Sequence, residues 1–386
     1  MALESTAAAQ PVGIYIHIPF CRGKCPYCDF YSISALDRIP AYLDALQWEM
    51  QQAAEQGLRA DTLYIGGGTP SVLTPRQMGR IVDTAAVCFN LTPTTEMTLE
   101  VNPASITTRD LQDYAAFGFN RLNIGVQSFD DRNLAFLGRR HSAEQALTAV
   151  QAGVAAGFNN IGLDLIFGLP DQTPGTWKKD LLQAIRLGPK HLACYMLSYE
   201  PGTRLHDDLQ TGRFAPLSEL RVADLFRMTH DFLGAAGYDH YEVSNYARGS
   251  RWRSKHNQKY WNGHPYIGFG PSAHGCRLPH RWWNHRSLDA YLESIGRGTP
   301  PLADEEVLSE EQQMMEALFL GLRQSDGIDL AGFQNRFQID FKLFFHTALD
   351  RCSAEGWIDM DDRRCRLTVE GMLFLDRIVD ELVELI

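Results

Sequence analysis

The first two-thirds of the chain alternates short apolar runs with longer amphipathic stretches. The short runs are rich in β-branched residues and predict strands at residues 13–19, 62–65, 97–101, 122–126, 161–167 and 191–197. The longer stretches place apolar residues three or four positions apart and predict helices at residues 39–56, 75–89, 108–117, 143–156 and 174–187. Strands and helices that alternate in this way form parallel pairs joined by right-handed crossovers.

The number of predicted strands limits the architecture. Six strands are too few for a closed barrel of eight, so the pattern predicts an α/β fold built as a partial (β/α)6, TIM-like barrel. An open sheet is the alternative. In both arrangements a ligand binds at the carboxyl ends of the strands, so the residues that follow each strand are the first candidates for chemistry.

The pattern changes in the last third of the chain. A helix at 217–236 is followed by a stretch dense in Gly, Pro and aromatic residues, which favours loops. Helices are then predicted at 309–322, 330–337, 341–355 and 371–385, with a hairpin of 357–360 and 365–369 before the last. This order resembles a winged-helix-like domain. We therefore divide the chain into an N-terminal tail (1–12), a barrel (13–240), an extension (241–299) and a C-terminal domain (300–386).

Charge separates these regions further. The formal net charge is −11, and residues 300–386 alone hold 8 Lys+Arg against 19 Asp+Glu. Residues 243–288 contain no Asp or Glu, but they hold eight cations, five His and four Trp. The acidic tail disfavours a DNA-binding role for the C-terminal domain, and no nucleic acid is expected as a partner. The acid-free stretch is suited to a small anionic ligand.

Composition and targeting signals point to an ordinary intracellular protein. Hydrophobic residues make up 45% of the chain and charged residues 22%, which is typical of a globular protein. The N-terminus has neither the basic nor the apolar segment of a secretory signal, and no run of about 18 apolar residues predicts a membrane span. The eight Cys do not form a disulfide-like framework, so we expect a cytoplasmic location.

Three cysteines stand close together directly after the first predicted strand. Cys21, Cys25 and Cys28 follow a C-x3-C-x2-C pattern. Thiolates on one short loop can bind three irons of a cubane cluster and leave the fourth iron open to another ligand. A structural zinc site is the alternative, but it needs a fourth ligand, and no second CxxC or HxxxH lies nearby. Three inert thiols are the remaining interpretation.

Here a resemblance becomes specific. The segment from Tyr15 to Cys28, with an aromatic Tyr27 before the third Cys, resembles the radical S-adenosylmethionine (SAM) signature of the oxygen-independent coproporphyrinogen III oxidase-like family. The resemblance covers nearly the whole chain and implies a radical SAM barrel with a [4Fe-4S] cluster. It also implies that the open iron binds the amino and carboxylate groups of SAM, with Tyr27 near the adenine.

The ends of the later strands carry further family-like motifs. A Gly-Gly-Gly-Thr-Pro segment follows the second strand; on its own it reads as a turn, but its glycines also allow a ligand to approach and its amides to bind a carboxylate. Asp164 lies inside an otherwise apolar strand, where a charge needs a partner. By the resemblance we assign SAM contacts to nine residues: Tyr15, Tyr27, Gly67, Gly68, Thr69, Glu100, Gln127, Arg139 and Asp164.

Two departures separate this chain from the porphyrin-synthesising oxidase. That enzyme has a further Cys two residues beyond the third cluster Cys, where this chain has Phe30. Its long N-terminal extension is also missing, because only 14 residues precede Tyr15. Both departures argue against oxidative decarboxylation, which we keep as the alternative function together with radical haem modification.

One added motif resembles the HemW-type haem chaperones of this family. His256, Asn257, Tyr260 and Trp261 match its HNxxYW pattern. Haem binds through an axial ligand, aromatic faces and cations for its propionates, and residues 243–288 supply all three. We take His256 as the axial ligand; a His that caps backbone groups is the plainer interpretation. Weaker candidates are His264, His274, His280 and His285.

The resemblance also implies partners. The leading function is a chaperone that binds haem and transfers it to haem-dependent proteins, with a [4Fe-4S] cluster and SAM in its barrel. By the same resemblance, the haem acceptors are membrane-associated, the protein is peripheral at the inner face of the membrane, and a homodimer forms when the cluster is present.

Overall fold

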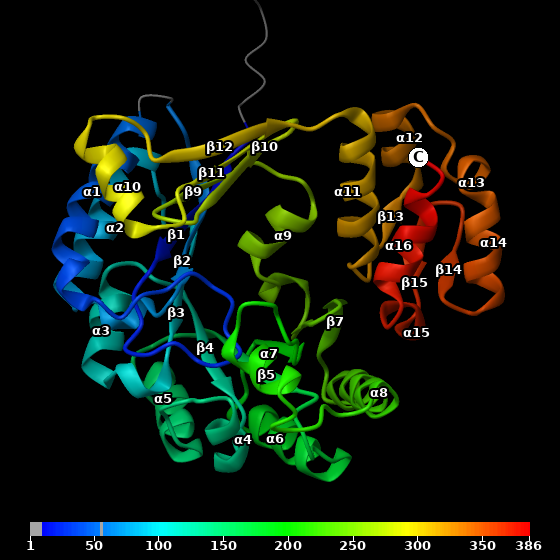
Figure 1. Cartoon of the computed structure of the whole chain (residues 1–386), viewed down its shortest axis with the longest axis horizontal. Helices are drawn as coiled ribbons and strands as arrows, with labels where there is room; N and C mark the ends of the chain where they lie inside the picture. The colour runs from blue at the N-terminus through cyan, green and yellow to red at the C-terminus, as the bar shows by residue number, and fades with distance from the viewer. Residues whose placement is uncertain (1–9, 55–56) are drawn as a thin grey trace, which may run out of the picture.

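Six parallel strands form the centre of the protein, here described from a computed structural model for residues 10–54 and 57–386 (Figure 1). Most of the N-terminal tail, residues 1–9, lies outside the described residues, as do residues 55–56 at the end of the first predicted helix. The strands are β1 (Val12–Ile18), β2 (Ala60–Gly67), β3 (Glu96–Val101), β4 (Arg121–Gln127), β5 (Asn160–Phe167) and β6 (His191–Met196).

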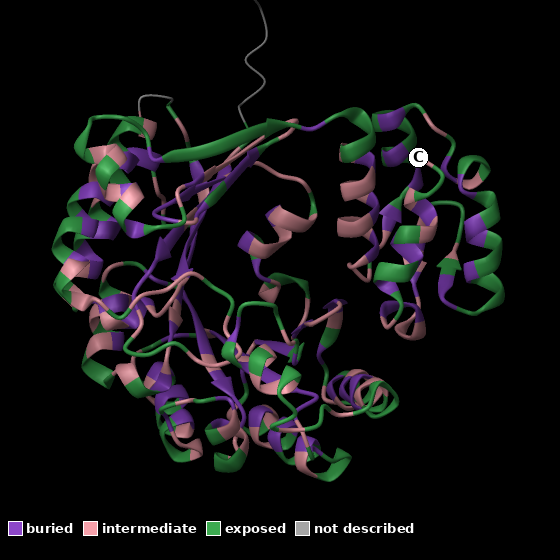
Figure 2. Cartoon of the chain, viewed as in Figure 1, coloured by how far each residue is buried: buried purple, intermediate pink, exposed green. Residues whose placement is uncertain are grey.

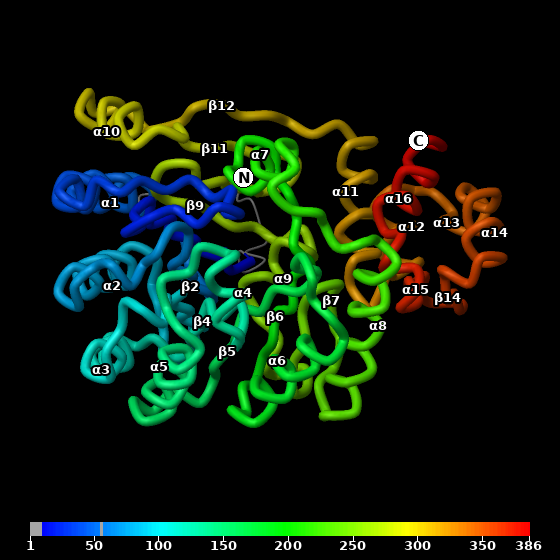
Figure 3. The backbone as a smooth tube through the Cα atoms, turned by 60° about the horizontal axis from the view of Figure 1, so that its bottom comes forward, coloured from blue at the N-terminus to red at the C-terminus, as the bar shows by residue number. Residues whose placement is uncertain are grey.

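Helices cover the outer face of these strands. They are α1 (Ile39–Ala54), α2 (Pro75–Phe89), α3 (Thr108–Ala116), α5 (Ala143–Ala155), α6 (Pro174–Leu187) and α8 (Glu219–Ala235). Two short helices, α4 (Asp131–Phe136) and α7 (Arg204–Gln210), lie instead near the segment that follows β1, where Leu137 and Leu205 pack with Tyr27. Figure 3 shows α1, α2, α3, α5 and α6 following one another around the outside. Adjacent strands pair in chain order from β1 to β6, so the partial barrel predicted from the sequence is confirmed.

Side chains of each strand alternate between two environments. On β1, Ile14, Ile16 and Ile18 are fully buried in the main hydrophobic core, whereas Tyr15 and His17 contact other rings inside the barrel. This burial on both faces explains why the strands read as nearly continuous apolar runs (Figure 2). Polar side chains on the inner face are the exceptions, and they come together in a site.

The extension lengthens the sheet rather than forming the expected loops. On one edge, β8 (Asn245–Ala247) and β7 (Asp239–Glu242) follow β6; on the other, β9 (Tyr266–Phe269) pairs with β1. Three antiparallel strands continue from β9: β10 (His274–Arg277), β11 (His280–Asn284) and β12 (Leu302–Val307). The loop prediction was wrong for these segments because strands of three to five residues are too short to show a clear apolar periodicity and depend on their neighbours for pairing.

The helix α9 (Lys255–Trp261) closes one end of the barrel. Its backbone N–H groups at Lys255 and His256 donate to the Glu96 carboxylate at the start of β3. The His256 ring bonds to Thr62 near the start of β2. We call this closed end, made by α9 and the amino ends of β2 and β3, the barrel floor, and the opposite end, at the carboxyl ends of β1–β6, the barrel mouth.

The C-terminal domain is helical with a small sheet, as predicted. Two predicted helices are each divided in two, at Phe345 and after Met372. Its helices are α11 (Glu310–Leu322), α12 (Leu330–Phe337), α13 (Phe341–Phe344), α14 (His346–Ala354), α15 (Val369–Met372) and α16 (Leu375–Val383), preceded by α10 (Leu288–Gly296) of the extension. Its strands are β13 (Ile328–Asp329), β14 (Ile358–Met360) and β15 (Arg364–Leu367), in the order β13-β15-β14.

Within the described residues, no helix combines the length and apolarity that crossing a membrane requires. The outermost strand β12 exposes all six of its residues, including the acidic run Asp304, Glu305 and Glu306.

Candidate functional site

The cysteine loop lies at the barrel mouth, directly after β1. The Cys21 thiol lies 3.2 Å from the Thr69 hydroxyl, and the Cys25 sulfur lies 3.8 Å from Arg139 Nη1. Cys21, Cys25 and Cys28 are partly exposed, while the other five cysteines are buried. The three cysteines of the loop are thus accessible to a ligand at the barrel mouth. The other five are enclosed in the protein interior.

The environment of the thiols fits soft-metal coordination. Burial raises the pKa of Cys28, while the backbone amide of Phe30 and the charge of Lys24 act to lower it. In the described part of the chain, no three His, Cys, Asp or Glu side chains converge closely enough to bind a single metal ion. Thiolates are the ligands that iron–sulfur clusters require, so this donor set fits a cluster held by three protein ligands.

A cavity of about 540 Å³ opens beside the cysteine loop and extends along the inside of the barrel. Cys28 lines it, together with residues from β2, β3, β4 and β5. Eight of the nine residues assigned to SAM line this cavity: Tyr27, Gly67, Gly68, Thr69, Glu100, Gln127, Arg139 and Asp164. The exception is Tyr15, which packs 6.2 Å from the Tyr64 ring and bonds to His17.

The glycine segment after β2 is shaped by backbone packing. Gly67 has φ +107, a conformation that favours glycine. A Cβ atom at Gly68 would lie 2.8 Å from the Phe20 carbonyl oxygen. The amides of Gly68 and Thr69 donate to backbone carbonyls, and that of Gly67 donates to Glu100 at 3.3 Å. The amides are thus not free to bind a carboxylate, contrary to our expectation, because the loop is tied to β1.

Two carboxyl groups dominate the electrostatics of the cavity. Burial, together with the nearby charge of Asp164, raises the pKa of Glu100 to about 7 despite a hydrogen bond from Tyr64, whose hydroxyl lies 2.8 Å away. Burial likewise raises the pKa of Asp164 to about 6, although the Asn123 amide donates to it at 2.7 Å. Acidic groups of this kind are stabilised as carboxylates when a cation enters beside them.

Buried polar atoms without partners indicate that the cavity accommodates a polar ligand. Among the described residues, Asp164 Oδ1 and Arg139 Nε are buried and have no hydrogen-bond partner. Such atoms are uncommon in folded proteins and mark places where water or a ligand binds. A ligand with an ammonium group, a sulfonium group and ribose hydroxyls, as SAM has, fits the free acceptor of Asp164 and the free donor of Arg139 in this acidic cavity.

Sequence reasoning missed the polar residues deeper in the cavity. Arg121 and Asn123 line it from β4, and His191 lines it from β6. Arg121 Nε and His191 Nδ1 are also buried without partners among the described residues. A signal for the first two existed, because polar residues occupy alternate positions of β4 and so share its inner face.

The HNxxYW motif lies on α9 at the barrel floor, and its histidine is enclosed. His256 is 1% exposed; its Nδ1 lies 2.8 Å from Thr62 Oγ1 and its Nε2 lies 2.8 Å from the Tyr260 hydroxyl. Burial, helped by the charges of Lys259 and Arg121, lowers its pKa to about 3. Both ring nitrogens therefore have partners, so ligation of a metal by His256 requires one of these bonds to break.

The other motif residues point in different directions. Asn257 lines the barrel cavity, whereas the Trp261 ring packs 5.8 Å from Tyr241 and the Trp261 carbonyl accepts a hydrogen bond from Gln324. The motif thus connects the barrel interior with the side facing the C-terminal domain.

The weaker histidine candidates are dispersed over the extension. His274 and His280 are exposed, and His274 stacks on Trp283 with ring centroids 5.9 Å apart. His264 and His285 are partly buried. Each lies outside the cavity described above.

Several cations of the acid-free stretch already have acidic partners. Arg253 pairs with Asp326 at 2.9 Å, Lys259 pairs with Asp61 at 2.8 Å, and Arg281 pairs with Glu316. Two of these partners belong to the C-terminal domain. The basic stretch and the acidic domain therefore neutralise each other in part, which reduces the charge left for an anionic ligand.

Comparison with known proteins gives consistent matches. Residues 15–184 match the Radical SAM superfamily, and residues 308–374 match the HemN C-terminal domain. The solved structure of coproporphyrinogen III oxidase (HemN) from Escherichia coli aligns with a TM-score of 0.83 at 23% identity, covering 97% of this chain and 90% of that chain. At this identity the likeness supports the fold alone.

Curated relatives match over nearly the full length. The protein named "Heme chaperone HemW" from Lactococcus lactis is 35% identical, covering 94% of this chain and 94% of the relative. The protein of the same name from Bacillus subtilis is 33% identical over 93% of this chain and 96% of its own length. Together with the cysteine loop and the barrel, these matches establish that the chain belongs to the HemW family of the radical SAM superfamily.

Proposed function

We propose that the protein is a haem chaperone that binds haem and transfers it to haem-dependent proteins, with a [4Fe-4S] cluster and SAM in its barrel. The observation that supports this most strongly is the HNxxYW motif on α9 in a chain similar over nearly its whole length to proteins named "Heme chaperone HemW". Haem and haem-acceptor proteins are the partners that this function requires.

At the barrel mouth, the proposal assigns the cluster to Cys21, Cys25 and Cys28. When bound, the cluster supplies an open iron for the amino-acid part of SAM. The nine residues assigned to SAM keep that role in the proposal, including Tyr15, whose ring packs 6.2 Å from the ring of the cavity residue Tyr64. Glu100 and Asp164 accept hydrogen bonds from the cationic, hydroxylated ligand, and its positive charge holds both groups as carboxylates.

At the barrel floor, the proposal assigns the haem iron to His256, with Asn257, Tyr260 and Trp261 as further haem contacts. A neutral imidazole is the form that binds iron, and burial keeps His256 neutral. Because Nε2 is bonded to Tyr260, ligation at this nitrogen requires the Tyr260 side chain to move away. Haem binding and a change at α9 are therefore expected together.

A haem titration tests the assignment. The purified protein, His256→Ala and the control His346→Ala, which removes an exposed ring on α14, are titrated with haem while the Soret band is recorded. We expect binding to the wild type and the control and a loss of at least about tenfold in affinity for His256→Ala. Absence of binding to the wild type would contradict the function; unchanged binding by His256→Ala would contradict only the ligand.

A second experiment separates a chaperone from an enzyme. One anaerobically reconstituted sample is assayed for haem transfer to an apo-acceptor and for SAM cleavage with coproporphyrinogen III and a reductant. Transfer without protoporphyrinogen formation supports the chaperone. Product formation supports the alternative, oxidative decarboxylation.

The finer proposals concern assembly and location. We infer that the protein forms a homodimer when the cluster is present. We also infer that it is cytoplasmic and binds peripherally to the inner face of the membrane, where its haem acceptors lie. Size-exclusion chromatography with and without the cluster checks the first. Co-sedimentation with anionic vesicles, with and without a membrane-bound acceptor, checks the second.

A further inference from the structure

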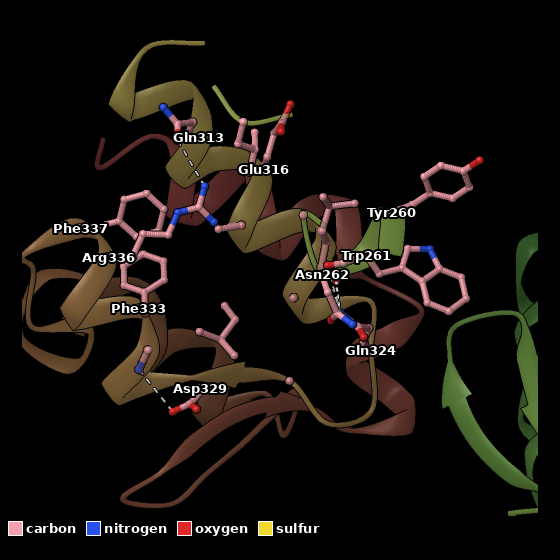
Figure 4. Close-up of a pocket in the computed structure, with 18 of the residues that line it drawn as sticks. Tyr260, Trp261, Asn262, Gln313, Glu316, Gln324, Asp329, Phe333, Arg336 and Phe337 are labelled. Atoms are coloured by element: carbon pink, nitrogen blue, oxygen red, sulfur yellow. Dashed lines mark hydrogen bonds between the residues drawn. The ribbon is translucent and has the colours of Figure 1, made fainter. Parts of the chain in front are cut away.

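A second cavity lies between the extension and the C-terminal domain. It has a volume of about 410 Å³, within the range of about 300–1,000 Å³ in which small-molecule sites fall, and such sites favour domain interfaces. One wall comes from the end of α9, β9, β10 and the start of β11, and the other from α11, β13 and α12 (Figure 4). We call it the interdomain cleft.

The cleft has an apolar face. Phe333 and Phe337 project from α12, and Leu278, Ala317 and Leu320 line other parts of the wall. Aromatic and aliphatic side chains that line an open cavity favour a ligand with an apolar body.

Two arginines of the cleft have no carboxylate partner among the described residues. Arg336 contacts the Gln313 side-chain oxygen at 3.3 Å and the Phe337 ring, and Arg364 donates to the carbonyl oxygens of Asp326 and Gly327. Unpaired guanidinium groups in a partly apolar cavity are suited to a ligand that carries carboxylates.

The carboxylates of the cleft are already engaged. Glu316 pairs with Arg281, and Asp329 accepts a hydrogen bond from the Gly332 amide at the start of α12. Neither forms an ion pair with Arg336 or Arg364 among the described residues, although the charge of Glu316 acts on Arg336 from a distance. The cleft thus combines an apolar face with two available cations, which is the pattern that a flat ring with propionate groups requires.

The side chain of Tyr260 lies between the cleft and His256. Tyr260 lines the cleft, its hydroxyl lies 2.8 Å from His256 Nε2, and its ring packs edge-on at 4.5 Å against Tyr266, another lining residue. In Figure 4 the rings of Tyr260 and Trp261 point away from α12, back toward the barrel. Displacing Tyr260 would therefore open His256 Nε2 toward the cleft.

We propose that the interdomain cleft is the binding site for the tetrapyrrole, with its propionates at Arg336 and Arg364 and its iron reaching His256 when Tyr260 moves. This rests on the proposed haem function and adds the place where the macrocycle lies. The C-terminal domain then supplies half of the haem site, and α9 stands between haem and the barrel interior.

The test uses haem and metal-free protoporphyrin IX as probes, titrated into the full-length protein. Arg336→Ala removes an exposed cation of the cleft, and Ala317→Trp fills it. Arg363→Ala removes an exposed arginine of the same domain that does not line the cleft. Circular dichroism and thermal unfolding check that each variant is folded.

We expect Arg336→Ala to weaken both probes about tenfold, because a charge-assisted hydrogen bond is lost, and Ala317→Trp to weaken them more. Arg363→Ala should stay within about twofold of the wild type. His256→Ala should weaken haem but not protoporphyrin IX, which has no iron to ligate.

Two results would overturn the proposal, and they are distinguishable. If the wild type binds haem and both cleft variants bind the probes equally well, the site lies elsewhere while the haem function stands. If the wild type binds neither probe, the haem function fails and the cleft proposal fails with it.

Discussion

The cysteine loop at the barrel mouth is accessible, whereas the histidine of the HNxxYW motif at the barrel floor is enclosed. At the mouth, the three cluster thiols are partly exposed, and Phe30 and Met196, which line the same cavity as Cys28, are 66% and 57% exposed. At the floor, His256 and Glu96 are buried, and their polar atoms bond to α9 and to β2. One motif is open to ligand, and the other is closed by its own partners.

This difference determines which hydrogen bonds each site must break before its ligand can bind. A ligand at the mouth meets polar atoms of Asp164 and Arg139 that have no partner among the described residues, so binding adds hydrogen bonds. A haem ligated by His256 first breaks a hydrogen bond, at a net cost of about 1 kcal/mol, and displaces a packed side chain. The mouth is prepared for its ligand, whereas the floor depends on a conformational change.

The largest effect is expected at the mouth. Cys28→Ala should abolish cluster assembly, because two thiolates cannot hold a cubane that has no fourth protein ligand. Iron and acid-labile sulfide per chain, measured after anaerobic reconstitution, should fall from about four each to near zero. The control Cys88→Ala changes a cysteine on α2 and should retain its iron. A cluster of full iron content in Cys28→Ala would refute the assignment.

A substitution at the barrel floor should lower the stability of the protein. His256→Ala should reduce the free energy of unfolding by about 3 kcal/mol, because it leaves a cavity and removes the partner of the Thr62 hydroxyl. Urea unfolding of the haem-free protein measures this. His280→Ala, at an exposed position, should change stability by less than about 0.5 kcal/mol. Equal stability of both variants would show that the packing and hydrogen bonds of His256 contribute little to the free energy of unfolding.

Glu100 at the barrel mouth should make the stability of the protein depend on pH. The pKa of Glu100 is raised to about 7, so the folded protein retains a proton that the unfolded chain releases near pH 4.5. Its contribution to stability is complete below about pH 4.5 and is lost as pH rises through about 7. Glu100→Gln removes this loss and should be more stable than the wild type by about 2 kcal/mol near pH 8, but not near pH 4.5.

Urea unfolding at several pH values measures that difference. Glu311→Gln, at an exposed position of α11, is the matched control and should follow the wild type at every pH. A parallel pH dependence in Glu100→Gln and the wild type would mean that Glu100 titrates as a solvated carboxyl.

The smallest effect tests the closure of the floor directly. Tyr260→Phe retains the ring but removes the hydroxyl that occupies His256 Nε2. Haem affinity should rise by about two- to fivefold, which corresponds to one hydrogen bond that no longer has to break. A Soret titration checks this. A fall in affinity would instead indicate that the Tyr260 hydroxyl contacts the haem.

The sequence predicted the mouth better than the floor for a physical reason. Strand ends such as Glu100 and Gln127 are local features, because a parallel barrel brings every carboxyl end to one side. The floor depends on contacts such as Thr62 with His256, which are 194 positions apart and leave no periodic signal. Likewise β12, with the sequence LADEEV, has no apolar face and forms only because β11 pairs with it.

The exposed strand β12 has a consequence for how the protein meets other copies of itself. The outer edge of a long sheet offers unpaired backbone groups to any similar strand, which is a route to aggregation. Asp304, Glu305 and Glu306 place three negative charges on that edge, so two such edges repel each other before they can pair. Part of the acidic excess thus protects the sheet, and neutralising these residues should make the protein self-associate through β12.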